Sequence, residues 1–270
     1  MKTHFINSQN LHLIQKQATS CVMALGYFDG IHLGHQQVIK TAREEANKRG
    51  LPLAVMSFRP HPINVLSKGQ SIVPHLTTPC EKEKRLKQLG VDLFYLVDFT
   101  LAFAALTSSQ FVEDYLMKLD VVHAVAGFDF SYGVKGVAKL SQIVADSNGE
   151  ITVTKVECID YDGEKISSSA IRQRLLAAAV HEIPHFLGDH FNSKVHWDGN
   201  KFQQIEKTML PSAGIYKVIL ELPNKQLRTY ISIDAAGQIQ RMERQRRLPK
   251  GIFSIHWLQQ VEKAVPSKAI

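Results

Sequence analysis

The stretch CVMALGYFDGIHLGHQQVIKTAREEANKRG, Cys21 to Gly50, decides the fold. It starts with a short apolar run, residues 21–28, that is typical of a buried strand, passes through a glycine-rich turn, and continues as a longer amphipathic segment. The apolar residues of that segment recur at helical spacing: Val38, Ile39, Ala42 and Ala46. Gly50 follows the last of them, in the position where glycine commonly ends a helix. A strand, a tight turn and a helix in this order are typical of a parallel βαβ unit.

The same alternation of strands and helices continues to about residue 180. Further apolar runs predict strands over residues 52–58, 92–99, 121–128 and 150–159. Amphipathic spacing between the runs predicts helices over residues 81–90 and 108–119. The pattern predicts an α/β domain with a parallel, Rossmann-like sheet.

The character of the chain changes after about Gly188. Turn residues occur as WDGN at 197–200, PSAG at 211–214 and PNK at 223–225. The runs between and after these turns, IYKVILEL and LRTYISI, alternate apolar and polar residues, which predicts antiparallel strands. We interpret this part as a small antiparallel β domain, a reduced barrel. We therefore expect two domains, residues 1–186 and residues 187–270.

The composition is that of a globular protein, because 44% of the 270 residues are hydrophobic and 21% are charged. No apolar run approaches the roughly 18 residues that a membrane-spanning helix needs, and the first thirty residues lack the pattern of a leader, so we expect a cytoplasmic protein with no membrane partner. Cys21, Cys80 and Cys158 are too scattered for a disulfide framework or a cysteine zinc site. We expect them to be buried, reduced thiols.

The formal net charge of +7 lies almost wholly in the second domain. Residues 187–270 hold 13 Lys and Arg against 7 Asp and Glu, whereas residues 1–186 hold 19 against 18. The densest basic stretch is RMERQRRLPK, Arg241 to Lys250, which is either a solvated edge or a nucleic-acid contact. The solvated edge is the more ordinary interpretation, so we do not expect a nucleic-acid partner.

The turn GYFDGIHLGH, Gly26 to His35, lies where the first predicted strand ends and its helix begins. Ligands bind at that edge of an open α/β sheet, and the free amides of a helix start attract anions. The three glycines allow a tight turn and a close approach of a ligand to the backbone. The turn therefore predicts a phosphate site.

Two histidines in this turn, His32 and His35, are three residues apart, so their imidazoles would project to one side of the first helical turn. There the ring N–H groups could donate hydrogen bonds to phosphate oxygens. Two other interpretations stay open. The pair could hold zinc, although the segment offers only Asp29 as a third ligand, or both could be ordinary structural histidines.

Five elements in order make the chain resemble a known family. The motif GxFDGxHxGH after the first strand is similar to the HxGH nucleotidyltransferase motif of bacterial FAD synthetases. The other elements are similar to segments of the same family: FRPHP at 58–62, a middle section at 77–92 and 103–116, GFDFSYG at 127–133 and ISSSAIR at 166–172. The resemblance covers about residues 20–190.

The resemblance implies that the chain transfers AMP from ATP to FMN, giving FAD and pyrophosphate, with Mg²⁺ carried on the phosphates of ATP. A phosphate monoester is largely ionised at neutral pH, so the attacking group needs no general base. Catalytic roles are implied for His32, His35 and Arg172. The implied ATP-binding residues are Gly26, Phe28, Asp29, Gly30, Gly34, Ser167, Ser168 and Ser169.

The last element, ISSSAIRQRLLAAA over residues 166–179, also has the pattern of an ordinary helix start. Its capping residue would be Ser167 or Ser168. The face expected to be buried carries Leu175, Leu176 and Ala179. Beside the HxGH motif we favour a phosphate site, because arginine donates paired hydrogen bonds to phosphate oxygens. The family usually has threonine in place of Ser169, a difference that keeps the hydroxyl.

A flavin site needs a flat apolar slot with a few polar contacts, because the isoalloxazine is a large aromatic ring system with a polar edge. The candidates are Phe58, Pro60, His61, Pro62, Phe128, Asp129 and Phe130, with Tyr132 as a further ring. A phenylalanine at a strand end is also commonly part of the core. The family usually has arginine and phenylalanine where Ser131 and Tyr132 stand, so this loop departs from the family pattern.

In most members of the family the second domain is a riboflavin kinase, a small β-barrel that makes FMN. PSAGIYKVIL, residues 211–220, resembles a strand of that kinase. The Gly-Phe-Pro-Thr-Ala-Asn element that supplies the kinase's nucleotide and magnesium contacts does not occur in the chain, and no segment matches the one with its catalytic glutamate. We predict FMN adenylyltransferase activity without riboflavin kinase activity.

Two other functions fit the same residues. One is a flavin- or nucleotide-binding regulator without catalysis that binds RNA through the basic second domain. RNA affinity that falls steeply with salt, without FAD formation, would favour it. The other is an adenylyltransferase whose acceptor is a different phosphomonoester, such as a pantetheine phosphate. Consumption of ATP without flavin binding would favour that one.

Overall fold

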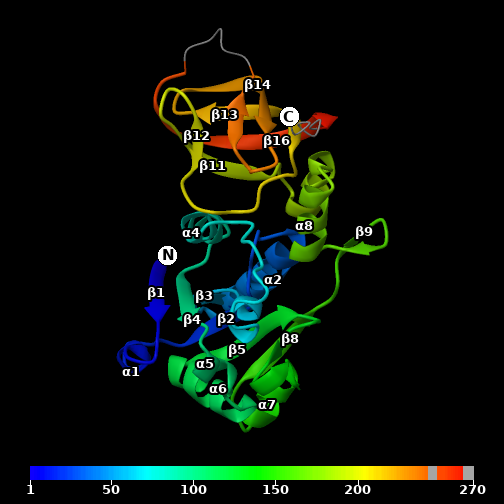
Figure 1. Ribbon diagram of the computed structural model, residues 1–270. Helices are drawn as coiled ribbons and strands as arrows, with labels where there is room; N and C mark the ends of the chain where they lie inside the picture. The colour runs from blue at the N-terminus through cyan, green and yellow to red at the C-terminus, as the bar shows by residue number, and fades with distance from the viewer. Residues whose placement is uncertain (243–247, 264–270) are drawn as a thin grey trace. The chain divides into compact units, whose positions relative to one another are not determined.

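The apolar runs of the first part of the chain form a six-stranded sheet in the computed structural model, and all its neighbouring strands are parallel (Figure 1). The order across the sheet is β1-β4-β3-β2-β5-β8. The strands are β1 (Lys2–Ile6), β2 (Cys21–Leu25), β3 (Leu53–Arg59), β4 (Leu93–Asp98), β5 (Val121–Gly127) and β8 (Thr152–Val156). The predicted Rossmann-like α/β fold is confirmed.

The structure describes residues 1–242 and 248–263, which form two compact units. The first consists of Met1–Val73 and Pro79–Ile159, and the second of Pro74–Thr78 and Asp160–Ile270. Each unit is described by itself. The domain boundary expected between residues 186 and 187 stays a prediction.

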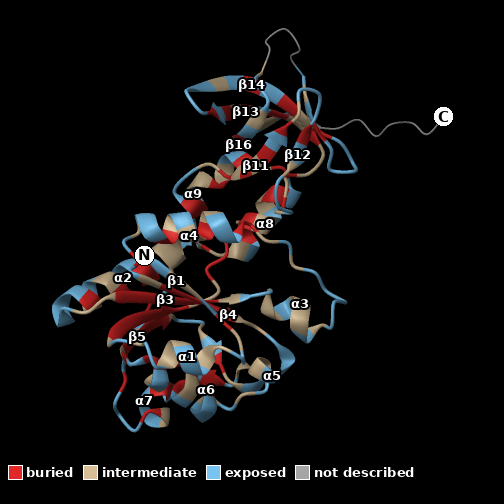
Figure 2. Cartoon of the chain, turned by 90° about the vertical axis from the view of Figure 1, so that its left-hand side faces the viewer, coloured by how far each residue is buried: buried red, intermediate tan, exposed pale blue. Residues whose placement is uncertain are grey.

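Helices cover both faces of the sheet. Successive residues of a strand point to opposite sides, so alternate residues pack against different helices. The helices of the first unit are α1 (Leu11–Gln15), α2 (Leu33–Arg49), α3 (Pro62–Leu66), α4 (Pro79–Gln88), α5 (Leu101–Ala104), α6 (Ser108–Tyr115) and α7 (Gln142–Asp146). On β2, Met23 and Leu25 pack with α1, α6 and α7, whereas Val22 and Ala24 pack with α2 and α4. Figure 2 shows the buried strands between these two helical layers. Burial on both faces explains why the strands are continuous apolar runs.

The connections out of β2 and β5 determine where a ligand can bind. The two strands are neighbours, but β2 leads to α2 on one face of the sheet and β5 leads through α7 to β8 on the other. Adjacent strands with connections on opposite faces leave a crevice at their carboxyl ends. The turn Gly26–His35 follows β2 and the loop Gly127–Gly133 follows β5. Both motifs therefore begin at the carboxyl ends of these two neighbouring strands, the edge where open α/β sheets bind ligands.

The predicted elements are present, with shifted ends. The first predicted strand stops at Leu25, and the helix predicted over 108–119 is α6 followed by a short 3₁₀ turn, Met117–Leu119. All four residues predicted for the buried face of α2 are buried, and Gly50 ends that helix with a φ of 63°. Strand β1 has no sequence prediction, because only Ile6 of its five residues is buried.

Three burial predictions are wrong. Cys21 is buried, but Cys80 and Cys158 are exposed. Cys80 lies in α4, where Lys82 and Leu86 form the buried face, and a residue two positions before Lys82 points to the other side of the helix. Leu176 is 66% exposed, because Leu175, one residue earlier, already occupies the buried face of its helix.

The second unit contains the predicted antiparallel barrel, which is closed by six strands in the order β11-β12-β15-β14-β13-β16. They are β11 (Asn192–Trp197), β12 (Phe202–Gln204), β13 (Gly214–Leu222), β14 (Lys225–Ile233), β15 (Ile239–Arg241) and β16 (Gly251–Lys263). Residues alternate along β13, with Tyr216 inside and Lys217 outside. Two tryptophans, Trp197 and Trp257, are buried in the barrel, and the Trp257 indole donates a hydrogen bond to the Ser193 hydroxyl at 3.0 Å.

Before the barrel, the second unit has a hairpin of β9 (Asp160–Tyr161) and β10 (Glu164–Lys165), followed by the helices α8 (Ser168–Leu176) and α9 (Pro184–Leu187). The basic stretch Arg241 to Lys250 includes residues 243–247, which lie outside the described residues. Among the residues that the structure describes, no helix has both the length and the apolar character needed to cross a membrane.

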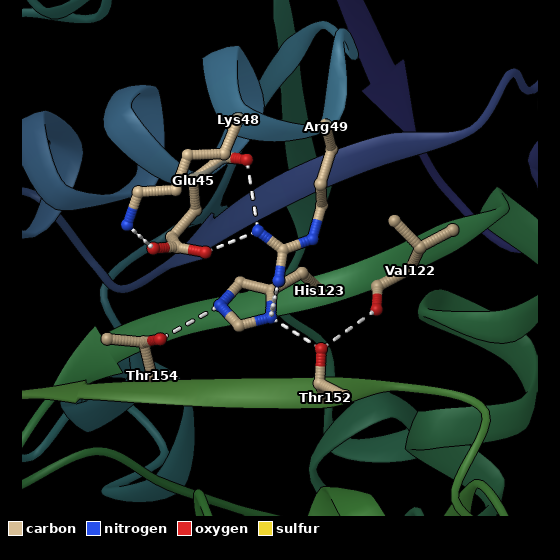
Figure 3. A network of polar contacts seen from close by, with 7 residues as sticks. All are labelled: Glu45, Lys48, Arg49, Val122, His123, Thr152 and Thr154. Atoms are coloured by element: carbon tan, nitrogen blue, oxygen red, sulfur yellow. Dashed lines mark hydrogen bonds and ion pairs between the residues drawn. The ribbon is translucent and has the colours of Figure 1, made fainter.

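A histidine at the amino end of β5 ties the end of α2 to the sheet (Figure 3). His123 is buried, its Nδ1 lies 2.6 Å from the Thr152 hydroxyl, and its Nε2 lies 2.9 Å from the Thr154 hydroxyl. Arg49, the last residue of α2, approaches Nδ1 at 3.3 Å and also pairs with Glu45. Because a guanidinium can only donate, Nδ1 accepts, and the neutral ring carries its proton on Nε2.

Acid is expected to weaken this tie. Burial, followed by the charge of Arg49, lowers the pKa of His123 below its usual value of 6.5, against the opposite effect of Glu45. The unfolded chain then takes up a proton that the folded chain does not, so the free energy of unfolding falls as the pH drops below about 6.5. Melting temperatures between pH 7 and pH 5 should fall less in His123→Gln than in the wild type. The exposed His12→Gln is the control, and a slope unchanged by His123→Gln would contradict the prediction.

Candidate active site

The turn after β2 has an unusual backbone conformation. Phe28 and Ile31 have φ values of 52° and 45°, in the left-handed region that residues other than glycine rarely adopt, and Gly30 has a φ of 76°. Gly26 allows the turn to fold back on itself, since a Cβ at this position would lie 3.0 Å from the ring of Phe28. Such strain persists only where the surroundings hold the chain in place, and it concentrates at functional sites.

Of the predicted ATP-binding residues in this turn, three are glycines and the other two have buried side chains. The ring of Phe28 is buried in the core between the sheet and α2, and the side chain of Asp29 is also buried. Gly34 lies in the first turn of α2, whose first turn holds no acidic residue. The start of this 17-residue helix therefore presents its amides and partial positive charge at the carboxyl end of β2.

The two histidines lie together at the start of α2. His32 is the N-cap residue, and its Nδ1 accepts a hydrogen bond from the amide of His35 at 3.3 Å. The two rings are stacked, with centroids 3.6 Å apart and planes inclined by 21°. Because Nδ1 of His32 accepts this hydrogen bond, the ring proton that could be donated to a ligand lies on Nε2. The sequence expectation of imidazoles on one side of the helix start agrees with this geometry.

Three side chains outside the predicted set donate hydrogen bonds to carbonyls of this turn. Lys82 donates to Tyr27 at 2.8 Å, Arg85 to Gly30 at 3.1 Å, and Gln36 to Ile31 at 3.0 Å. Lys82 and Arg85 come from α4, a helix whose run EKEKRLK looks like a solvated face. The spacing of Lys82 to Leu86, four residues, is the one sequence signal that places this lysine on the buried side.

The segment FRPHP, which begins in the last two residues of β3, lies beside the turn. His61 is the N-cap of α3, and its Nδ1 accepts a hydrogen bond from the amide of Ile63 at 3.1 Å. Its ring contacts that of Tyr27 edge to face, with centroids 4.4 Å apart. Pro62 is the first residue of α3, and the side chain of Pro60 is exposed. The structure thus brings a predicted flavin-binding residue, His61, next to the predicted phosphate turn.

A chain of ring contacts connects two of the predicted flavin residues. Phe58 contacts Phe103 (centroids 5.5 Å apart), Phe103 contacts Phe111 (6.1 Å), Phe111 contacts Tyr132 (5.2 Å) and Tyr132 stacks on Phe130 (6.0 Å). Phe58 and Phe130 are half-buried and pack against the same core cluster. The two rings at the ends of the chain therefore expose apolar surface on one face of the sheet. Phe103 was not expected from the sequence, because α5 shows no helical periodicity.

The loop after β5 divides into exposed and buried positions. Phe128 is 41% exposed and Asp129 is exposed, whereas Tyr132 is buried. The Tyr132 hydroxyl donates to Asp146 at 2.9 Å, and burial together with this hydrogen bond raises the pKa of Tyr132 well above its usual range. Tyr132 is thus part of the core that anchors the loop, and it does not serve as a free ring of a slot.

The predicted phosphate-binding residues of ISSSAIR belong to the second unit. Ser167 is the N-cap of α8 and accepts a hydrogen bond from the amide of Ala170 at 3.1 Å, while Ser168 is the first helical residue and Ser169 is exposed. Arg172 donates through Nε to the carbonyl of Pro74 at 3.0 Å. The capping prediction is confirmed for Ser167. The roles of Ser167–Ser169 and Arg172 toward phosphate stay predictions.

Arg174, which the sequence did not single out, fixes α8 within its unit. Its guanidinium makes a bidentate pair with Glu164, with distances of 3.0 and 2.7 Å, and a further ion pair with Glu182 at 3.0 Å. It also lies over the ring of Phe186, 3.9 Å from the centroid. The planar fork of arginine suits this set of partners, so Arg174 is a structural residue in spite of its closeness to Arg172.

Comparison with known proteins identifies the family. Residues 14–170 match the family model for FAD synthetase, which includes the turn after β2, the FRPHP segment and the loop after β5. The chain belongs to the FAD synthetase family. Within this family it is 38% identical to the bifunctional riboflavin kinase/FMN adenylyltransferase of Bacillus subtilis over 234 residues, 82% of this chain and 74% of that protein.

Two further relatives match nearly their full length. The FAD synthetase of Listeria monocytogenes is 28% identical over 235 residues, 86% of this chain and 95% of that protein. A crystal structure of a macrolide-efflux protein from Streptococcus pneumoniae superimposes with a TM-score of 0.84 and 27% identity, covering 100% of this chain and 94% of that one. The α/β sheet and the β-barrel of this FAD synthetase family member therefore each have a counterpart in a solved structure.

Proposed function

We propose that this protein is an FMN adenylyltransferase, which makes FAD and pyrophosphate from FMN and ATP. The observation that carries the proposal is the start of α2, where the stacked imidazoles of His32 and His35 lie in the first turn of a 17-residue helix at the carboxyl end of β2. Stacked ring donors and a helix start suit a polyphosphate. In a chain of the FAD synthetase family, that polyphosphate is the triphosphate of ATP.

The reaction needs positioning and charge stabilisation more than proton transfer. A phosphate oxygen of FMN attacks the α-phosphorus of ATP, a new P–O bond forms, and the bond from the α-phosphorus to the bridging oxygen breaks to release pyrophosphate. The attacking oxygen is already ionised near pH 7. The proposed work of His32 and His35 is to donate hydrogen bonds where negative charge builds on the leaving pyrophosphate.

The flavin would be held by the apolar surface at the ends of the aromatic chain. Phe58 and Phe130 offer half-buried ring surface, and Phe128, Asp129 and His61 offer contacts at its edge. The prolines Pro60 and Pro62 restrict the backbone that carries His61. These assignments rest on the family match, on the contact of His61 with Tyr27 in the turn after β2, and on the position of Phe128, Asp129 and Phe130 after the neighbouring strand β5.

We expect Mg²⁺ to arrive bound to the phosphates of ATP, where it would neutralise part of their charge. Within the described ranges, no three His, Cys, Asp or Glu side chains lie close enough together to hold a metal.

A purified sample of the full chain incubated with ATP, Mg²⁺ and FMN tests the proposal. Chromatography should show FAD and pyrophosphate in equal amounts. A parallel incubation with 4′-phosphopantetheine in place of FMN should give no adenylylated product. Product in the second incubation alone would reassign the acceptor, and RNA binding without either product would support a regulator.

We further propose that the chain lacks riboflavin kinase activity. The Gly-Phe-Pro-Thr-Ala-Asn element is absent from the sequence, and the chain covers 95% of a relative named FAD synthetase. Given riboflavin, ATP and Mg²⁺, the protein should form no FMN above the level of a sample without protein. FMN formed at a rate comparable with FAD formation would contradict this proposal.

A further inference from the structure

A buried lysine lies beneath the turn that follows β2. In α4, the two buried residues are Leu86, which packs in the core, and Lys82, which is only 7% exposed. The ammonium of Lys82 donates to the carbonyl of Tyr27 at 2.8 Å and to the hydroxyl of Ser57 at 3.1 Å. The Ser57 hydroxyl in turn donates to the same Tyr27 carbonyl at 2.6 Å. Three polar groups from α4, β3 and the turn therefore meet at one point.

Keeping a charge at this position costs stability. Burial lowers the pKa of Lys82 to about 8, and only the nearby charge of Asp29 acts in the other direction. At pH 7 the side chain is therefore mainly protonated. Burying this charge costs more free energy than burying an apolar side chain at the same position would. The ammonium also lies over the ring of Tyr27, 4.7 Å from its centroid. Every contact of Lys82 that offsets the cost is made with the turn or with its neighbour β3.

The turn requires support of this kind. Its backbone is held at positive φ at Phe28 and Ile31, a conformation that is unfavourable for residues other than glycine. Each of its carbonyls at Tyr27, Gly30 and Ile31 accepts a hydrogen bond from a side chain, and two of those donors, Lys82 and Arg85, come from α4. Helix α4 thus braces the turn from one side.

We propose that Lys82 is a positioning residue: by joining the Tyr27 carbonyl to Ser57 on the neighbouring strand, it fixes the turn that presents His32 and His35. The lysine acts through the backbone and through the two imidazoles. This inference rests on the proposed function for its effect on catalysis, but the geometry that it describes does not depend on that function.

The test compares Lys82→Met with Lys84→Met. Methionine matches the lysine side chain as far as Cε and lacks only the ammonium group, and Lys84 is exposed on the same helix. Loss of a hydrogen bond from a charged donor should lower the kcat of FAD formation about tenfold or more in Lys82→Met, with the KM for FMN changed by less than about twofold. Lys84→Met should behave as the wild type. A proportionate rise in the KM for FMN, or an unchanged kcat, would overturn the proposal.

Ser57→Ala provides a second variant that removes little volume. If Lys82 and Ser57 hold the Tyr27 carbonyl as one hydrogen-bonded group, Ser57→Ala should also lower kcat. The fold-loss of kcat in the double variant should then be smaller than the product of the two single fold-losses. Independent, multiplying effects would show that Lys82 and Ser57 act separately and would overturn the proposal. If Lys82→Met does not fold, Ser57→Ala still tests the proposal, because a wild-type kcat in Ser57→Ala would contradict it.

A readout without catalysis separates this inference from the proposed function. The imidazole ¹H–¹³C NMR signals of His32 and His35 should shift in Lys82→Met and Ser57→Ala but not in Lys84→Met. Signals that stay in place would overturn the inference even if the wild type makes FAD. If the signals shift in the two variants but the wild type itself makes no FAD, the inference about Lys82 is supported and the proposed adenylyltransferase activity is rejected.

Discussion

Replacement of His32 by asparagine is expected to lower the kcat of FAD formation by about a hundredfold. The imidazole of His32 caps α2 and stacks on His35, so its loss removes a donor proposed to act on the leaving pyrophosphate. Asparagine caps helices as well as any residue, so the free energy of unfolding should change little. Steady-state kinetics with FMN and ATP, together with chemical denaturation, measure both quantities.

The affinity for FMN serves as the internal control for that substitution. Since the proposed donors act on the triphosphate, the Kd for FMN in His32→Asn should stay within about twofold of the wild type. His35→Ala should cause a loss of kcat of similar size, because the rings act as a stacked pair. If the Kd for FMN rose as much as kcat fell, the two imidazoles would belong to the flavin site and the proposed mechanism would be wrong.

Replacement of Phe58 by alanine is expected to raise the Kd for FMN by about ten- to a hundredfold. Phe58 stands at the end of β3, half-buried, at one end of the aromatic chain that reaches Phe130. Removing a ring from an apolar contact costs on the order of 1.5–3 kcal/mol, which corresponds to that range of affinity. Quenching of flavin fluorescence on titration with protein measures the Kd.

Loss of packing inside the protein has to be separated from loss of the flavin contact. Phe58 also touches Phe99 and Phe103, so alanine will lower the melting temperature to some extent. Phe58→Leu keeps apolar volume without the flat ring and should give a Kd between wild type and alanine. The Kd for an ATP analogue should not change in either variant. An FMN affinity equal to that of the wild type would exclude Phe58 from the flavin site.

The first unit could be predicted from the sequence because its strands are buried on both faces. Continuous apolar runs such as Cys21–Leu25 mark central parallel strands, and a glycine-rich turn followed by a helical pattern marks the carboxyl end of such a strand. The edge strand β1 could not be predicted in this way, because solvent reaches most of its residues and it has no continuous buried run. The closed barrel could be predicted as antiparallel from alternation, but closure depends on pairing between β11 and β16, which are far apart in sequence.

Part of the candidate site could be predicted as well. Residues of the turn, such as Gly26 and His32, lie close together in sequence, so their common location needs only one local structure. Lys82 is different, because it reaches the turn from 55 residues away and sits in a run of charges that a solvated helix would also have. The burial of Tyr132 likewise depends on Asp146 and Phe111, partners that no spacing rule relates to it.

Both tryptophans of the chain, Trp197 and Trp257, are side chains of the barrel. Intrinsic tryptophan emission therefore reports on the barrel alone, while far-ultraviolet circular dichroism registers helices and strands of both units. Thermal melts followed by the two signals will coincide only if the units unfold together. A variant whose α/β sheet has come apart can still give a native emission spectrum, so fluorescence by itself is a poor check that an inactive protein is folded.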